Sequence, residues 1–228
     1  MTITLAFDVY GTMIDTSGVV TELERIIGDQ ASAFSQVWRE KQLEYSFRRG
    51  LMQNYQNFSV CTEQAFDYAC LLFGIKITPN QKKILMDGYK ILPPHPDVEE
   101  GLSKLKAAGF RMFAFSNGRA VDVQTLLDYA DIEGYFEGIV STDDIKSYKP
   151  NPGVYAHFLR QSRSTGSEAW LISSNPFDVI GAISAGMHAA WVKRSPEAIF
   201  DPWGIEPTIT VGGIIGLYEY LSHTGNPA

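Results

Sequence analysis

The chain has 228 residues, 45% of them hydrophobic and 20% charged, which fits a globular protein with one good-sized core and an accessory subdomain. A formal net charge of −7, with no run of basic residues longer than two, argues against nucleic acid or an anionic membrane as a partner. No secretory signal precedes the first apolar run, and no stretch approaches the roughly 18 apolar residues of a membrane span, so we expect a cytoplasmic protein.

The first predicted element is a short buried strand at residues 3–7, which ends at Asp8 and a Gly11-Thr12 turn. In an open α/β sheet, ligands bind beyond the carboxyl ends of the strands, which is where Asp8 is expected to lie. A single acid in such a place is explained more often by capping of a turn. The function of Asp8 therefore depends on the residues that follow the later strands.

A helical insertion is predicted next, because residues 15–92 lose the strand pattern and carry apolar side chains at helical spacing. A turn or loop is expected at residues 54–58, and prolines at positions 93, 94 and 96 predict a stiff connection back to the core. We therefore expect a core domain formed by residues 1–14 and 93–228, and a helical subdomain formed by residues 15–92.

From residue 98 onward predicted helices and strands alternate, and Gly109 is expected to end the first of these helices. Such alternation implies right-handed crossover connections and predicts an α/β fold, a doubly wound, mostly parallel Rossmann-like sheet with helices on both faces. The predicted helices are 98–108, 121–129, 154–160, 179–185 and 214–221, and the predicted strands are 110–115, 138–141, 169–172, 188–192 and 208–211.

Polar residues follow this pattern in order: Asp8 after the first strand, Ser116 after the second, Lys149 before a proline, and Asp178 after a later strand. The set resembles the four motifs of the haloacid dehalogenase superfamily, and the similarity spans nearly the whole chain. The segments DVYGT, SNG, SYKP and SSNPFD, with WREKQLEY at residues 38–45, are most similar to the L-2-haloacid dehalogenases of type II. The resemblance implies that the helical subdomain is a cap over the active site.

The resemblance also implies that Asp8 is a nucleophile that forms an ester with the substrate, which divides a difficult displacement into two easier steps. The Thr12 hydroxyl is expected to fix one oxygen of this carboxylate, although a turn or helix cap explains Thr12 equally well. Lys149 is expected to pair with Asp8 and Asp178 and to keep both ionised.

Departure of a halide requires dipoles or a cation where negative charge develops. The resemblance assigns that part to Arg39, reaching in from the cap, with Asn175 on the same side. Without the matching WREKQLEY context, Arg39 would be interpreted as an exposed helix arginine. Ser116, with backbone N–H groups near Asn117, is expected to bind the substrate carboxylate.

Hydrolysis of the ester needs a base for water, and Asp178, oriented by Ser173 and Lys149, is the expected base. Tyr155 matches a family position near these groups, with a tyrosine on the core face of a helix as the competing interpretation. The apolar pocket is expected to be completed by Leu43, Phe58 and Phe177. Family members often carry tryptophan at position 177 and glutamine at position 40, where this chain has Phe177 and Glu40. These two departures affect the halide-binding site and the size of substrate that the pocket accepts.

Two positions separate a dehalogenase from a phosphatase of the same superfamily. Phosphatases usually carry a second Asp at the place of Tyr10, where it protonates the leaving alcohol. Tyrosine, with a pKa of about 10, cannot do so at neutral pH, but it can wall an apolar pocket. Phosphatases also usually carry an acid at the place of Ser174, and loss of that hard oxygen ligand weakens a magnesium site. Both differences favour cleavage of a carbon–halogen bond.

We therefore expect hydrolysis of short-chain (S)-2-haloacids to (R)-2-hydroxyacids with inversion, through an aspartyl ester and without a metal or other cofactor. The expected partner is a small 2-haloalkanoate, with no nucleic acid and no membrane, and the resemblance implies a homodimer. A phosphatase of the same superfamily is the first alternative, and a non-catalytic binding module on this fold is the second. Cys61 and Cys70 are expected to be free thiols, and the four histidines, which lack metal-ligand spacing, are expected to be non-catalytic.

Overall fold

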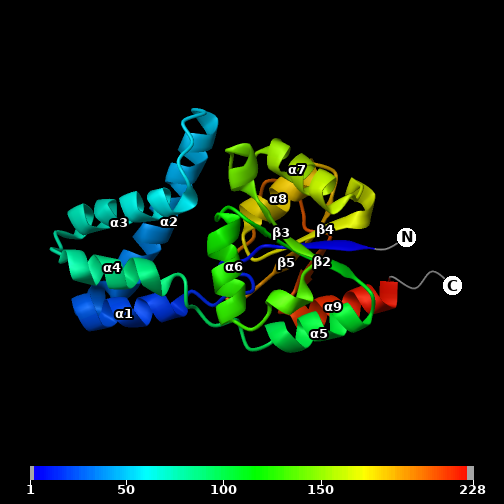
Figure 1. The fold of residues 1–228 in the computed structure, drawn as a ribbon, viewed down its shortest axis with the longest axis horizontal. Coiled ribbons are helices and arrows are strands. Elements are labelled where there is room, and N and C mark those ends of the chain that lie inside the picture. The colour runs from blue at the N-terminus through cyan, green and yellow to red at the C-terminus, as the bar shows by residue number, and fades with distance from the viewer. Residues whose placement is uncertain (1–2, 225–228) are drawn as a thin grey trace.

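The computed structural model describes residues 3–224, so the outermost parts of the predicted core, residues 1–2 and 225–228, lie outside the described residues. Within residues 3–224 a six-stranded sheet has the order β3-β2-β1-β4-β5-β6, and every neighbouring pair is parallel (Figure 1). The strands are β1 (Thr4–Phe7), β2 (Arg111–Ser116), β3 (Gly138–Ser141), β4 (Ala169–Ser173), β5 (His188–Val192) and β6 (Ile209–Val211). The predicted doubly wound parallel sheet is confirmed.

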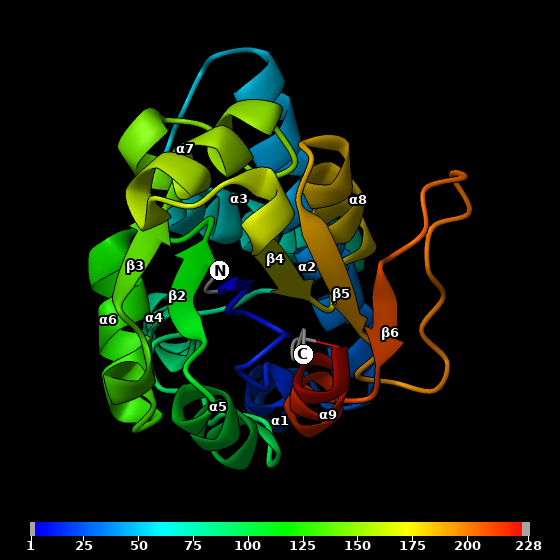
Figure 2. The ribbon, with the colours of Figure 1, turned by 90° about the vertical axis from the view of Figure 1, so that its right-hand side faces the viewer.

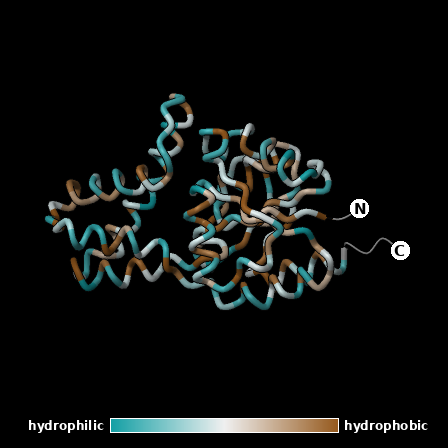
Figure 3. Tube along the Cα trace, viewed as in Figure 1, coloured by the Kyte–Doolittle hydropathy of each residue, from teal (hydrophilic) through white to brown (hydrophobic). Residues whose placement is uncertain are grey.

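Helices cover both faces of this sheet. Successive side chains of a strand point to opposite sides, so each face of the sheet has apolar side chains that pack against helices. Leu5 and Phe7 of β1 pack in one cluster with α5, α6 and α9, whereas Ala6 packs in another with α7 and α8 (Figure 2). Hydrophobic residues are concentrated in the strands between these layers (Figure 3). The helices of the core are α5 (Val98–Ala107), α6 (Ala120–Tyr129), α7 (Pro152–Ser162), α8 (Pro176–Ser184) and α9 (Ile214–Thr224), with short 3-10 turns at Glu133–Tyr135, Thr142–Ile145 and Gly166–Glu168.

Two of the core helices, α7 and α8, begin two or three residues earlier than predicted, and each begins with a proline in its first turn. Pro152 opens α7, with the Asn151 side chain accepting a hydrogen bond from the Gly153 N–H at 2.8 Å, and Pro176 opens α8. Proline fits there because the first N–H groups of a helix have no intrahelical partner. Gly109 ends α5 as predicted, with φ of 84°.

The helical insertion follows β1 and consists of α1 (Ser17–Ile27), a 3-10 turn (Gly28–Gln30), α2 (Ala31–Leu51), α3 (Phe58–Phe73) and α4 (Pro79–Gly88). Its centre is aromatic: the ring of Trp38 lies 5.0 Å from that of Phe66, and Phe34 lies 5.4 Å from Phe66. The predicted loop at 54–58 ends one residue earlier, since the Asn57 side chain caps α3 and Phe58 is its first residue.

Two chain segments that lie side by side join the insertion to the core. Ile14 forms an antiparallel bridge with Pro94, and the N–H of Asp15 donates to the carbonyl of Pro93 at 2.9 Å. A further contact between the insertion and the core lies away from these connecting segments, where the Tyr55 hydroxyl donates to Asp143 Oδ1 at 2.6 Å. None of the helices in residues 3–224 combines the length and apolar character that crossing a bilayer requires. Cys61 is buried and Cys70 half-buried, and both are free thiols.

Candidate active site

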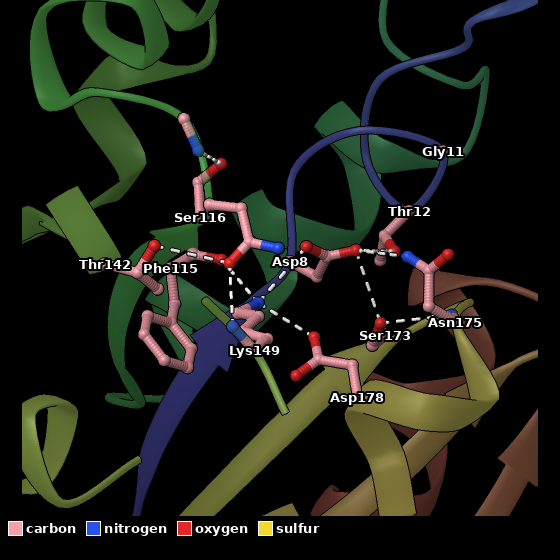
Figure 4. A network of polar contacts seen from close by, with 12 residues as sticks. Asp8, Gly11, Thr12, Phe115, Ser116, Thr142, Lys149, Ser173, Asn175 and Asp178 are labelled. Carbon is pink, nitrogen blue, oxygen red and sulfur yellow. Dashed lines mark hydrogen bonds and ion pairs between the residues drawn. The ribbon is translucent and has the colours of Figure 1, made fainter. Parts of the chain in front are cut away.

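The carboxyl ends of β1, β2 and β4 bring the sequence motifs to one edge of the sheet (Figure 4). Phe7 pairs with Ala114 of β2 and with Ile172 of β4, so Asp8 lies level with the ends of both strands. The N–H of Asp8 donates to the carbonyl of Ile172 at 2.9 Å. Backbone pairing therefore fixes the position of the Asp8 main chain. Hydrogen bonds from side chains fix the orientation of its carboxylate.

The two oxygens of the Asp8 carboxylate have unequal surroundings. Oδ2 accepts hydrogen bonds from the Thr12 hydroxyl at 2.9 Å, the Ser173 hydroxyl at 3.3 Å and the Asn175 amide at 2.8 Å. Oδ1 accepts from the Lys149 ammonium at 3.2 Å. The residue is only 8% exposed. An oriented and largely desolvated carboxylate of this kind can act as a nucleophile, and Oδ1 is the less encumbered of its two oxygens.

Lys149 is buried at the centre of the polar network and uses its ammonium group on three acceptors. Nζ lies 2.8 Å from the carbonyl of Phe115, 2.8 Å from Asp178 Oδ2 and 3.2 Å from Asp8 Oδ1. Burial lowers the pKa of Lys149, but the charges of Asp178 and Asp8 outweigh it, and the net shift is upward. The lysine thus remains a cation between two carboxylates.

Asp178, in the first turn of α8, is fully buried beside this lysine. Its Oδ1 accepts a hydrogen bond from the Tyr155 hydroxyl at 2.8 Å. Burial, the largest cause, and the charge of Asp8 both raise the pKa of Asp178, whereas Lys149 and Tyr155 lower it. The net shift is upward. Gly181 permits the approach of Tyr155, because a Cβ at this position would lie 2.4 Å from the hydroxyl oxygen. Tyr155 therefore faces the site as well as the core.

The side chains of Ser173 and Asn117 have partners that the sequence did not indicate. Ser173 was expected to orient Asp178, but its hydroxyl donates to Asp8 Oδ2, because Ser173 ends β4 level with Asp8 while Asp178 lies in the first turn of α8. The side-chain oxygen of Asn117 accepts from the backbone N–H of Lys149 at 3.0 Å, so that side chain holds the lysine segment. The hydroxyl of Ser116 accepts from the N–H of Gly118 at 3.0 Å, which leaves its hydrogen for another acceptor.

Arg39 reaches the core from α2 of the insertion. Its Nη1 donates to Gln42 Oε1 at 2.7 Å, and its Nη2 lies 3.4 Å from Asn175 Oδ1. Since the Asn175 amide nitrogen donates to Asp8, Asn175 links the guanidinium to the carboxylate. Burial lowers the pKa of Arg39, and this shift is opposed by Tyr89 and Asp8. The arrangement places a partly desolvated cation next to the acid, with an amide between them.

A cavity of about 570 Å³ lies between the insertion and the core beside these groups. Its core wall contains Tyr10, Gly11, Gly118, Arg119, Asp122 and Asn175. Its wall from the insertion and the connecting segments contains Asp15, Thr16, Ser17, Val20, Ser35, Gln36, Arg39, Gln42, Phe58, Ser59, Thr62, Glu63, Met86, Tyr89 and Lys90. Tyr10 and Phe58 both lie in this lining.

Leu43 and Phe177, which were expected in the pocket, lie outside this lining. The ring of Phe177 packs edge-on against Phe47 of α2, with the ring centres 5.1 Å apart, so it contributes to the contact between insertion and core. Sequence reasoning did not identify Gln42 and Thr62 as cavity residues. Gln42 carries a usable signal, because it lies three residues after Arg39 on the same helix face.

Tyr10 and Ser174 occupy the two positions where a phosphatase would carry acids. Burial raises the pKa of Tyr10, and Asp122 and Tyr89 raise it further, so its hydroxyl holds its proton at neutral pH. The Ser174 hydroxyl donates to the carbonyl of Gly11 at 2.9 Å. Among residues 3–224, no group of three or more His, Cys, Asp or Glu side chains is arranged to hold a metal ion.

Known proteins are similar to this chain over nearly its whole length. A family model described as haloacid dehalogenase-like hydrolase matches residues 4–186. The (S)-2-haloacid dehalogenase H-109 of Pseudomonas putida is 33% identical over 217 residues, which cover 95% of this chain and 96% of that protein.

Solved structures have the same architecture, with the helical insertion after the first strand. The L-2-haloacid dehalogenase of Xanthobacter autotrophicus matches with a TM-score of 0.91 at 28% identity, over 98% of this chain and 99% of that chain. A structure of the Xanthobacter dehalogenase with chloropropionic acid covalently bound matches with a TM-score of 0.90 at 29% identity, over 97% and 99% of the two chains.

Proposed function

The chain belongs to the haloacid dehalogenase-like hydrolases, and from that premise we propose that it hydrolyses short-chain (S)-2-haloacids to (R)-2-hydroxyacids through an ester on Asp8. The observation that carries this proposal is the sequence of contacts from Arg39 to Asn175 and from Asn175 to Asp8. A nucleophilic carboxylate and a cation for the leaving halide then flank one small substrate.

In the first step Oδ1 of Asp8 attacks C2 of the substrate from the side opposite the halogen. The new C2–O bond forms as the carbon–halogen bond breaks, and the halide leaves with the bonding electron pair. Three hydrogen bonds on Oδ2 hold the carboxylate, which leaves Oδ1 to react. The departing halide meets Arg39 and the second amide hydrogen of Asn175. Attack from behind inverts C2.

In the second step a water molecule loses a proton to Asp178, and the resulting hydroxide attacks the carboxyl carbon of the Asp8 ester. The bond between that carbon and the alkyl oxygen breaks, the alkoxide takes up the proton held by Asp178, and the hydroxyacid is released. The Asp8 carboxyl group then loses its proton to solvent and is again a carboxylate. The upward shift of the Asp178 pKa supports its assignment as the base, because the carboxylate then binds a proton more readily than an ordinary aspartate. Lys149 holds Asp178 in its ionised form between turnovers.

The substrate carboxylate is assigned to Ser116, with backbone N–H groups near Asn117. The free hydrogen of the Ser116 hydroxyl supports this assignment, since Gly118 occupies an acceptor position of that hydroxyl. A relative from Xanthobacter autotrophicus holds chloropropionic acid covalently, which supports an ester intermediate in this chain. We also propose that residues 15–92 act as the cap, while the homodimer and the cytoplasmic location stay predictions.

The phosphatase alternative has less support at the same positions. Tyr10 holds its proton too tightly to protonate a leaving alcohol, and the Ser174 hydroxyl offers magnesium only a neutral oxygen that is already bonded to Gly11. A haloacid needs neither function, because halide leaves without a proton and carries a single charge.

Halide release from chloro-, bromo- and fluoroacetate and from both 2-chloropropionate enantiomers, measured in excess EDTA, tests the proposal. We expect halide from the L enantiomer and a D-lactate product, with no loss of rate in EDTA. A matched assay with a phosphate monoester and added magnesium provides the comparison. Phosphate release that strictly requires magnesium, without halide release in the first assay, would establish the phosphatase instead.

A further inference from the structure

Gln42 lies one turn after Arg39 on α2 and binds the Arg39 guanidinium. Its carbonyl oxygen accepts from Nη1 of Arg39 at 2.7 Å. Gln42 is only 2% exposed, although glutamine is usually a surface residue. The acidic neighbour Glu40 is instead exposed and accepts from the Gln36 amide at 3.0 Å. The buried partner of Arg39 is therefore a neutral amide.

Thr62 of α3 determines which way this amide points. The Thr62 hydroxyl donates to the carbonyl of Phe58 at 2.9 Å, so its single hydrogen is already used. Towards Gln42 it can only accept, and Gln42 Nε2 lies 2.5 Å away. The amide nitrogen must therefore face Thr62 and the amide oxygen must face Arg39. The reverse orientation would set an NH₂ group against the guanidinium, donor against donor.

We propose that Gln42 and Thr62 form a positioning pair that aims Arg39 at the leaving halide. This inference rests on the proposed function, in which Arg39 receives that halide. A long arginine side chain has many rotamers, and a donor that is already oriented stabilises developing charge without reorganising. Because the partner is an amide, it fixes the guanidinium without offsetting its charge. A carboxylate at position 42 would pair with the cation and weaken its attraction for halide.

Thr62→Val tests the pair, because it removes the hydroxyl and keeps the side-chain shape. The readout is the rate of halide release in a single turnover, with enzyme in excess, for chloroacetate and for bromoacetate. We expect a loss of about fivefold with chloroacetate and a smaller loss with bromoacetate, since the smaller chloride binds hydrogen-bond donors more strongly. Thr62→Ser, which keeps the hydroxyl, is expected to restore the rate. The rate of ester hydrolysis is expected to stay unchanged in both variants.

A double-mutant cycle with Arg39→Lys tells whether the pair acts through Arg39. We expect Thr62→Val to cause no further loss in the Arg39→Lys background, because the group that it positions is already gone. Gln42→Glu carries the same test if Thr62→Val does not fold, and is expected to slow chloride release in wild type but not in Arg39→Ala, where no cation remains for the carboxylate to pair with.

The possible failures are distinguishable. If Arg39→Lys leaves the rate of halide release unchanged, Arg39 does not receive the halide, and both the proposed role of Arg39 and the positioning pair are wrong. If Arg39→Lys is slow but the loss from Thr62→Val is absent, equal for chloride and bromide, or undiminished in the Arg39→Lys background, only the positioning pair is wrong.

Discussion

The hydroxyl of Tyr155 donates a 2.8 Å hydrogen bond to Oδ1 of Asp178, and both side chains are completely buried. This bond favours the ionised carboxylate, against the effect of burial. It therefore determines in part the pH below which Asp178 can no longer accept a proton from water.

Tyr155→Phe is predicted to move the acid limb of the pH–rate profile to higher pH. Asp178 must be ionised to act as a base, so activity falls as pH decreases through its pKa. Loss of the Tyr155 hydrogen bond raises that pKa further, and activity is then lost at a higher pH. We also expect the free energy of unfolding to fall by about 1.5 kcal/mol, because a buried charged acceptor loses a donor.

The measurements for Tyr155→Phe are kcat between pH 4 and 9 and a urea titration. Tyr129→Phe is the matched control, since Tyr129 is 59% exposed on α6 and lies outside the cavity lining. An acid limb at the wild-type position would show that Tyr155 is a core residue with no influence on the base.

Arg39→Lys is predicted to lower turnover by at least about tenfold, which corresponds to roughly 1.4 kcal/mol of transition-state stabilisation. Lysine keeps the charge but replaces a planar fork of donors by a compact, strongly hydrated ammonium. It also cannot bond Gln42 and Asn175 in the same directions. Steady-state kinetics with L-2-chloropropionate provide the measurement, and wild-type values would show that Arg39 is an ordinary residue of the cap.

Tyr55→Phe is predicted to loosen the contact between cap and core that lies away from the connecting segments. Tyr55 stacks on Tyr148 with ring centres 5.1 Å apart and donates to Asp143. Removal of the hydroxyl should lower the free energy of unfolding by about 1 kcal/mol and raise KM for the haloacid, because the cap is then held less firmly against the core. Urea titration and initial rates test this prediction, and an unchanged urea midpoint would exclude a stabilising part for this contact.

The fold could be predicted from the sequence because its signals are local. Apolar runs bounded by turn residues gave each strand of the sheet within a residue or two, and Gly109 ended α5 where expected. The starts of α7 and α8 were missed although the signal was present, since Asn151-Pro152 and Asn175-Pro176 both have an N-cap residue before a proline.

The partners within the site are harder to predict, because they depend on packing between distant segments. Strand order places Asp8 and Ser173 at one edge, but only the register shows that Ser173 bonds Asp8 rather than Asp178. Gln42 and Thr62 lie on different helices, and no spacing in the sequence relates them. Phe177 likewise packs against Phe47 of α2, and no local signal in the sequence predicts this contact between the insertion and the core.

The proposed mechanism requires an ester on Asp8, and the origin of the oxygen in the product shows whether that ester forms. With enzyme in excess over L-2-chloropropionate in H₂¹⁸O, each site turns over at most once. We predict an unlabelled hydroxyl in the lactate and one heavy oxygen in the peptide that contains Asp8, because water attacks the carboxyl carbon of the ester. A labelled lactate with an unlabelled Asp8 peptide would rule out the ester, since water activated by Asp178 would then attack C2 directly.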